Sequence, residues 1–249
     1  MHALYMSVFT AEMLCSCDAG GRAWHYELRR GYWSALAFTD AQIGRVLSAL
    51  ETSGHKNSTI VAVVGDHGYG LGELGSWGKY TLLEQGTRAP MIISKPGQQA
   101  PGHTSAALVE FVDLMPTLAD LAGLPPPPGV DGISLAKLLD NPTAGVGKGR
   151  AFSQYPAVHR VAGNDALVMG TAIRVDRYRY VAWCRYNFTL WRPDFDACVG
   201  HELYAYEGGH EADVDTFDLV NHADDPVFKG VRAQLHGEIS KHWNGGIGG

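Results

Sequence analysis

The chain has 249 residues, of which 45% are hydrophobic and 18% are charged, and its formal net charge is −6. This size and composition fit a globular protein with one main core and a smaller appended layer. The negative charge and the scattered Lys and Arg residues argue against nucleic-acid binding. No run approaches the roughly 20 apolar residues that span a bilayer, so no membrane span is expected.

The first fifteen residues are apolar but carry no basic n-region and no small-x-small cleavage site, so they form no clear signal peptide. The spacing that follows predicts a helix from Gly31 to Ser53, and Gly54 suits its left-handed cap. The apolar positions of this helix recur every three, four and seven residues: Leu36, Ile43, Val46, Leu47 and Leu50.

A run of five apolar residues, Ile60 to Val64, is the next element and contains three valines. It predicts a strand buried on both faces of a parallel sheet. Ligands of such sheets collect at the carboxyl ends of the strands, and Asp66 and His67 stand at that end. A second buried strand is predicted near Met91 to Ser94.

A glycine-rich loop connects these two strands, and it also carries Trp77 and ends at Lys79. Six of its fourteen positions from residue 65 are glycine, namely Gly65, Gly68, Gly70, Gly72, Gly75 and Gly78. Such a loop indicates a backbone that bends tightly around a ligand, although surface loops can also be rich in glycine. Glu84, beyond this loop, is interpreted as a loop anchor.

A short helix is predicted from Asp113, its cap, to about Ala122, with Pro116 in its first turn and Gly123 at its end. The proline run 125–128 and the glycine- and proline-rich loop 140–150 then mark a change of organisation. We therefore predict two domains, residues 1–150 and residues 151–249.

Short strands and turns follow, and they predict a small antiparallel sheet from Ala166–Arg174, Tyr178–Arg185 and His201–Tyr206. A final helix opens at Asp225 and Pro226. Its apolar stripe has a period of four residues: Val227, Val231, Leu235 and Ile239. Residues 245–249 are expected to be disordered.

The segment from Asp66-His67-Gly68 through Leu71-Gly72-Glu73-Leu74-Gly75 to Trp77 and Lys79 resembles the sulfatases of the alkaline-phosphatase superfamily. The resemblance is strongest to their iduronate-sulfatase-like branch and extends, in the family's order, from Glu27 to Tyr204. It implies an α/β fold, a partial alkaline-phosphatase-like three-layer sandwich with a small C-terminal antiparallel sheet and helix.

The resemblance also implies roles for four residues. Asp66 and His67 would bind a divalent metal. The family resemblance implies Ca²⁺, and Mg²⁺ and Mn²⁺ stay open because an imidazole is an unusual calcium ligand. Lys79 would contact the sulfate oxygens as a catalytic and substrate-binding residue, and Trp77 would wall the substrate pocket. Without the family pattern, Lys79 reads as a surface charge and Trp77 as a core residue.

The sequence departs from the family pattern in several places. It has no paired aspartates and no Cys-x-Pro-x-Arg or Ser-x-Pro-x-Arg segment, whose first residue becomes the formylglycine nucleophile; Cys15 and Cys17 lack the proline. Leu74 and Arg88 stand where the nearest branch has histidine. The chain therefore resembles the later half of a sulfatase, with an N-terminal half missing, and we expect it to be inactive alone.

The first hypothesis is a sulfuric ester hydrolase acting on sulfate monoesters, with a sulfated small molecule or glycan such as a glycosaminoglycan as its partner. The alternatives are a truncated non-catalytic pseudoenzyme or binding module, and a related phosphate or phosphonate ester hydrolase. The resemblance implies a lysosomal or extracellular location, where Cys184 and Cys198 could pair or remain free thiols. No role is assigned to His103, His159, His201 or His210.

Overall fold

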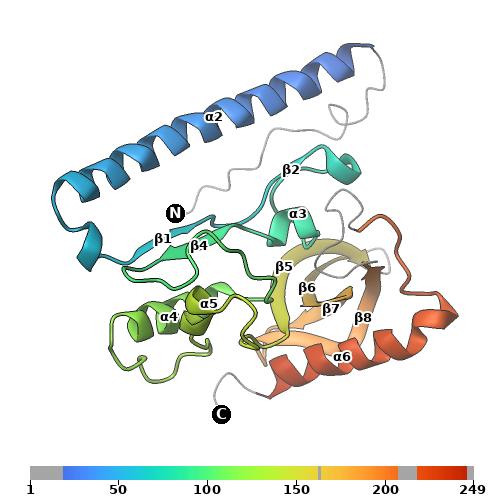
Figure 1. Cartoon of the computed structure of the whole chain (residues 1–249). Coiled ribbons are helices and arrows are strands. Elements are labelled where there is room, and N and C mark those ends of the chain that lie inside the picture. The colour runs from blue at the N-terminus through green and yellow to red at the C-terminus, as the bar shows by residue number, and fades with distance from the viewer. Residues whose placement is uncertain (1–18, 162–163, 207–217, 246–249) are drawn as a thin grey trace. The chain divides into compact units, whose positions relative to one another are not determined.

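The computed structural model describes residues 19–161, 164–206 and 218–245 (Figure 1). Cys15, Cys17, His210 and residues 246–249, for which disorder was predicted, lie outside these ranges. The chain divides into two compact units: residues 1–57 with 69–78, and residues 58–68 with 79–249. Each unit is described by itself. Among the described residues, no helix is both long and apolar enough to cross a membrane.

The first unit contains helix α2, Ala19–Thr52, and a small hairpin of β2, Gly70–Leu71, and β3, Trp77–Gly78. The helix begins well before the predicted start at Gly31. Glu27 and Arg30 form an ion pair at 2.6 Å one turn before that glycine, a spacing that supports a continuous helix. Gly31 itself has open space around it, so the helix passes through it without a break.

The hairpin is bonded to α2. The Nε atom of Arg29 donates to the Leu71 carbonyl at 2.8 Å, and the guanidinium lies 5.8 Å from the centre of the Trp77 ring. The 3₁₀ turn η2, Glu73–Gly75, joins the two short strands. Gly72, which precedes it, has φ 105°, and a Cβ there would lie 2.8 Å from the Trp77 ring. A glycine is therefore required at this position.

The two predicted buried strands are present in the second unit as β1, Val61–Val64, and β4, Met91–Ser94. The predicted parallel sheet is not found among the described strands, where β1 and β4 pair antiparallel with each other. Burial on both faces is also wrong in this structure, where residues alternate between half-buried and exposed. An apolar run shows that a strand avoids water, but the direction of its partner depends on the rest of the chain.

Short helices follow: α3, Glu84–Thr87; η3, Phe111–Asp113; α4, Leu114–Leu121; and α5, Ala136–Asp140. The 3₁₀ turn η1, Lys56–Ser58, precedes β1. Pro116 lies in the first turn of α4, as predicted. The Asp113 side chain, however, does not cap α4; it accepts from the backbone of Glu110 and of Ile133, at 2.9 Å each.

The larger sheet has four antiparallel strands in the order β5-β6-β7-β8. They are β5, Arg150–Val161; β6, Asn164–Val175; β7, Tyr178–Asn187; and β8, Arg192–Ala205. The three strands predicted from the sequence correspond to β6, β7 and β8, and β5 was missed. Cys184 on β7 and Cys198 on β8 are opposite each other and form a disulfide.

Buried side chains pack on both faces of this sheet. On one face, helix α6, Lys229–Asn244, packs Leu235 and Ile239 against Ile173 and Tyr180. The preceding turn η6, Pro226–Phe228, is capped by the predicted Asp225, which accepts from the Val227 backbone at 2.9 Å. The predicted apolar stripe continues only in part, because Val227 is 83% exposed.

On the opposite face of the sheet, Leu82 packs against Ala172 and Val181. Gly170 makes this contact possible, since a Cβ there would lie 2.8 Å from Leu82 and 2.6 Å from Trp183. The segment that follows the glycine-rich loop is thereby attached to the sheet. The predicted domain boundary after residue 150 stays a prediction; the Glu110 side chain accepts from the Phe152 backbone at 2.9 Å, across that position.

Candidate functional site

Asp66 and His67 lie directly after β1, at the end that was predicted to carry ligands. Oδ2 of Asp66 is 3.2 Å from Nε2 of His67, and Oδ1 accepts from the His67 backbone at 3.0 Å. The Asp66 side chain is 83% exposed and that of His67 is 33% exposed. The other ring nitrogen of His67, Nδ1, is bonded to the Gly68 carbonyl at 2.8 Å. A carboxylate oxygen and an imidazole nitrogen are thus held side by side.

The backbone of this loop is fixed against the segment that precedes β4. Gly65 N–H donates to the Pro90 carbonyl at 2.9 Å, and Gly68 N–H donates to the Gly86 carbonyl at 3.0 Å. A Cβ at Gly68 would lie 1.9 Å from the Gln85 carbonyl oxygen. Gly68 is therefore required by the close approach of two backbone segments, which gives one physical reason for the glycine content noted in the sequence.

Helix α3, against which this loop packs, is anchored by buried charges. Oε2 of Glu84 lies 3.3 Å from Nε of Arg174, and the Glu84 backbone N–H donates to Oδ2 of Asp218 at 2.7 Å. Asp218 also lies 2.7 Å from Nη2 of Arg179. The interpretation of Glu84 as a loop anchor agrees with this arrangement. Asp218 and the two arginines were not predicted, because their partners are distant in sequence.

Lys79 lies in the second unit and is exposed, with its Nζ atom 5.6 Å from the centre of the Tyr80 ring. Within the described ranges, no ion pair joins Lys79 to Asp66. Trp77 lies in the first unit, where its ring centre is 5.0 Å from that of His25. The structure therefore brings together Asp66 and His67, and the assignments of Lys79 and Trp77 stay predictions.

The chemistry of the pair fits part of a cation site. Two ligands of one divalent cation lie about 3 Å apart when each is 2.0–2.4 Å from the metal, and Nε2 of His67 has no hydrogen-bond partner in the described part of the chain. Among those residues, no group of three or more His, Cys, Asp and Glu side chains could hold a metal ion. Asp66 and His67 thus supply two ligands to a cation site that needs further ligands.

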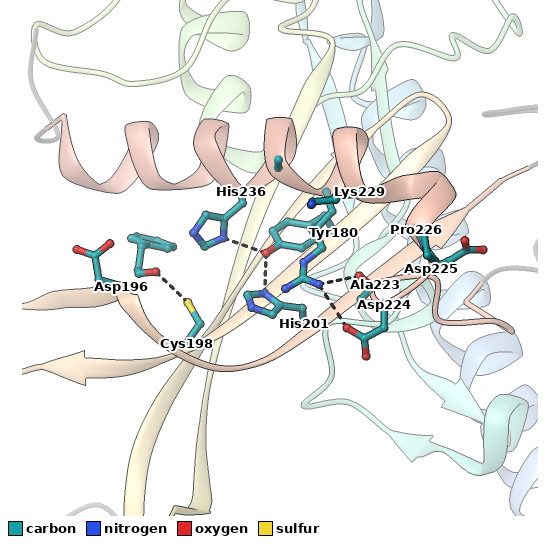
Figure 2. Close-up of a pocket in the computed structure, with 13 residues that line it drawn as sticks. Tyr180, Asp196, Cys198, His201, Ala223, Asp224, Asp225, Pro226, Lys229 and His236 are labelled. Atoms are coloured by element: carbon teal, nitrogen blue, oxygen red, sulfur yellow. Dashed lines mark hydrogen bonds and ion pairs between the residues drawn. The ribbon is translucent and has the colours of Figure 1, made fainter.

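A separate cavity of about 700 Å³ lies between α6 and the strands β7 and β8. Figure 2 shows Tyr180 at its centre, with His201 of β8 and His236 of α6 pointing toward the phenol oxygen. Nδ1 of His201 is 2.7 Å and Nδ1 of His236 is 2.9 Å from that oxygen. Arg232 and Lys229 also line the cavity. No sequence motif indicates this cluster, and the sequence alone assigns no role to His201.

Tyr180 has a single hydroxyl proton, so it donates to only one of the two histidines, and the ring nitrogen of the other histidine donates to the phenol oxygen. Burial lowers the pKa of both histidines and raises the pKa of Tyr180 to about 12. All three groups are consequently neutral near pH 7.

Family models and solved structures were found that are similar to this chain. The chain matches the family model Sulfatase over residues 10–124 and the model N-sulphoglucosamine sulphohydrolase, C-terminal, over residues 72–243. Phosphonate monoester hydrolase from Silicibacter pomeroyi superposes with a TM-score of 0.64 at 28% identity, over 82% of this chain and 38% of that one. BT4656, in complex with its substrate D-glucosamine-2-N,6-O-disulfate, superposes with a TM-score of 0.62 at 27% identity, over 83% of this chain and 39% of that one.

These likenesses assign the chain to the alkaline-phosphatase-like α/β fold, of which it covers a part. It belongs to the sulfatase family. Iduronate 2-sulfatase of Homo sapiens is 32% identical over 72% of this chain and 42% of its own length, and the Mus musculus enzyme is 31% identical over the same shares. N-acetylglucosamine-6-O-sulfatase of Bacteroides thetaiotaomicron is 35% identical over 58% of this chain and 27% of its own. The chain thus spans about two fifths of the iduronate 2-sulfatases.

Proposed function

We propose that this chain is the later part of a hydrolase of sulfate monoesters, and that Asp66 and His67 contribute to its divalent-cation site. The observation that carries the proposal is that Oδ2 of Asp66 lies 3.2 Å from Nε2 of His67, an atom with no hydrogen-bond partner among the described residues. A bound divalent cation would offset charge that develops on the sulfuryl oxygens. Calcium is the first candidate, and magnesium and manganese are the alternatives.

Lys79 is proposed to contact the sulfate group. Its exposed ammonium follows the glycine-rich loop directly and lies three residues before the buried Leu82. The contact of Leu82 therefore attaches the segment after Lys79 to the sheet. The exposed ammonium of Lys79 is accessible to an anion. Trp77 is proposed as an apolar wall of the substrate pocket.

The proposed substrates are sulfated sugars, including those of glycosaminoglycans. The support is the likeness to iduronate 2-sulfatase and to N-acetylglucosamine-6-O-sulfatase. The structural likeness to a phosphonate monoester hydrolase keeps a phosphate or phosphonate ester as a second candidate. A sulfate monoester and a phosphate monoester differ mainly in charge, since a sulfate monoester carries one negative charge and a phosphate monoester carries up to two.

An activity assay tests this proposal. Because the nucleophile segment of the family is not in this sequence, the 249 residues alone should not turn over an aryl sulfate. A chimera that places a sulfatase segment with Cys-x-Pro-x-Arg before this chain should hydrolyse aryl sulfate in preference to aryl phosphate. Asp66→Asn should then reduce kcat/KM by at least about 100-fold. Turnover by the chain alone, or a preference for the phosphate ester, would contradict the proposal.

A further inference from the structure

The loop that carries Asp66 and His67 takes its position from the segment 84–90. Two backbone hydrogen bonds connect them, from Gly65 to Pro90 and from Gly68 to Gly86. Gly68 lies so close to the Gln85 carbonyl that no side chain fits at position 68. The position of α3 therefore determines the position of the Asp66–His67 pair.

The sheet beneath α3 presents two arginines side by side. Arg174 of β6 and Arg179 of β7 are direct cross-strand partners, and their exposed fractions are only 9% and 1%. Like charges in this arrangement repel each other, and a buried charge needs a compensating partner. Glu84 compensates Arg174 and Asp218 compensates Arg179.

Asp218 connects this charge pair to the backbone of α3. One of its oxygens accepts from the Glu84 backbone N–H at 2.7 Å, and the other accepts from the Tyr206 hydroxyl at 2.7 Å. Its residue is 6% exposed. Its backbone has φ 60°, in the left-handed region that few residues other than glycine adopt. Asp218 is thus held in one place by several interactions, and Glu84 is held against it.

We propose that Asp218 is a positioning residue for Asp66 and His67, although it lies 134 residues beyond the Glu84 backbone that it holds. It acts through Glu84 and the backbone of segment 84–90, without contact to the pair itself. The link to cation binding rests on the proposed function. The mechanical link from Asp218 to Gly68 does not.

Amide hydrogen exchange of the whole chain, followed by NMR, tests the mechanical link. Asp218→Asn removes the charge and keeps an oxygen, and Glu110→Gln is the matched control, because Glu110 forms a part-buried pair with Lys148 at 2.7 Å elsewhere in the same unit. In Asp218→Asn, the amides of Gly65 and Gly68 should exchange about tenfold faster relative to those of β7. In Glu110→Gln, this ratio should stay unchanged.

Equal ratios in the two variants would overturn the proposal, since they would show only a general loss of stability. If Asp218→Asn does not fold, Tyr206→Phe is measured instead, because it removes the hydroxyl that donates to Asp218 and keeps the ion pair with Arg179. The amides of Gly65 and Gly68 should again exchange faster relative to the rest of the unit, and the absence of this local acceleration would overturn the proposal. A calcium titration of the same variants distinguishes the role of Asp218 in positioning the loop from the role of Asp66 and His67 in cation binding. Failure of the wild-type chain to bind calcium would count against the proposed function, while the exchange ratio would still decide the role of Asp218.

Discussion

Nη2 of Arg179 lies 2.7 Å from Oδ2 of Asp218, and both side chains are almost completely buried. Within the described residues, Nε and Nη1 of this arginine have no hydrogen-bond partner, so the charge depends mainly on Asp218. Removing one member of a buried pair leaves the other charge without compensation. This pair is therefore a sensitive point of the second unit.

Asp218→Ala should lower the free energy of unfolding by about 3–5 kcal/mol, as measured by the midpoint of urea denaturation. The control is Asp224→Ala, because Asp224 is fully exposed and pairs with Arg232 at 3.3 Å. Its loss should cost less than about 1 kcal/mol. Similar losses in the two variants would show that the buried pair has no special role.

Gly68→Ala should disrupt the loop of Asp66 and His67, because the new Cβ would lie 1.9 Å from the Gln85 carbonyl oxygen. We expect a loss of stability of at least about 1–3 kcal/mol, typical of overpacking against rigid neighbours. The same change at Gly31, in open space within α2, should stabilise the chain by about 0.5–1 kcal/mol. Thermal unfolding distinguishes these opposite signs, and a neutral Gly68→Ala would contradict the close approach.

The sequence allowed β1, β4 and most of the C-terminal sheet to be located, because their apolar and aromatic runs are local signals. The parallel sheet expected around β1 is not found among the described strands, because strand direction depends on residues far along the chain. β5 was missed because Pro156 and the polar residues Ser153 and Gln154 interrupt its β pattern. Pairing with β6 along its whole length overrides that local preference.

The candidate site was predictable in part. Asp66 and His67 were predicted from their place after an apolar run, and their side chains lie 3.2 Å apart. Their role as metal ligands stays a proposal. The anchors were not found, since an arginine in a strand usually faces solvent and nothing local indicates that Arg174 or Arg179 is buried. Their carboxylate partners come from segments that only the folded chain brings together.

The stability of the chain should fall as the pH drops below about 6.5. Burial lowers the folded-state pKa of His201 and His236, with Arg232 adding to the effect and Asp224 and Asp196 opposing it. The unfolded state then binds more protons below the ordinary histidine pKa. Stability is therefore complete above that value and is lost progressively as the pH falls toward the folded-state pKa values.

A double variant tests this prediction. His201→Gln with His236→Gln removes both titrating rings and keeps polar groups near Tyr180. Urea midpoints between pH 8 and pH 5 should vary less in this variant than in the wild type. His242 should account for a remaining slope, because burial lowers its pKa as well. An unchanged slope in the double variant would show that the cluster does not titrate as described.

The disulfide between Cys184 and Cys198 closes a loop with a sequence separation of 14 residues. Closing a loop of this size stabilises a protein by about 3 kcal/mol through its effect on the unfolded chain. Reduction should lower the urea midpoint accordingly, and Cys184→Ala with Cys198→Ala should no longer respond to reductant. Mass spectrometry of non-reduced peptides provides the direct check, and free thiols at both positions would refute the pairing.

The most direct test of the central claim is a calorimetric calcium titration of the wild-type chain, Asp66→Asn and the control Asp225→Asn. With only Asp66 and His67 as donors among the described residues, binding should be weaker than about 1 μM. We expect it to be lost in Asp66→Asn and kept in Asp225→Asn. Sub-micromolar binding would contradict the expected weak affinity, and equal binding by the wild type and Asp66→Asn would contradict the assignment of this pair to the cation site.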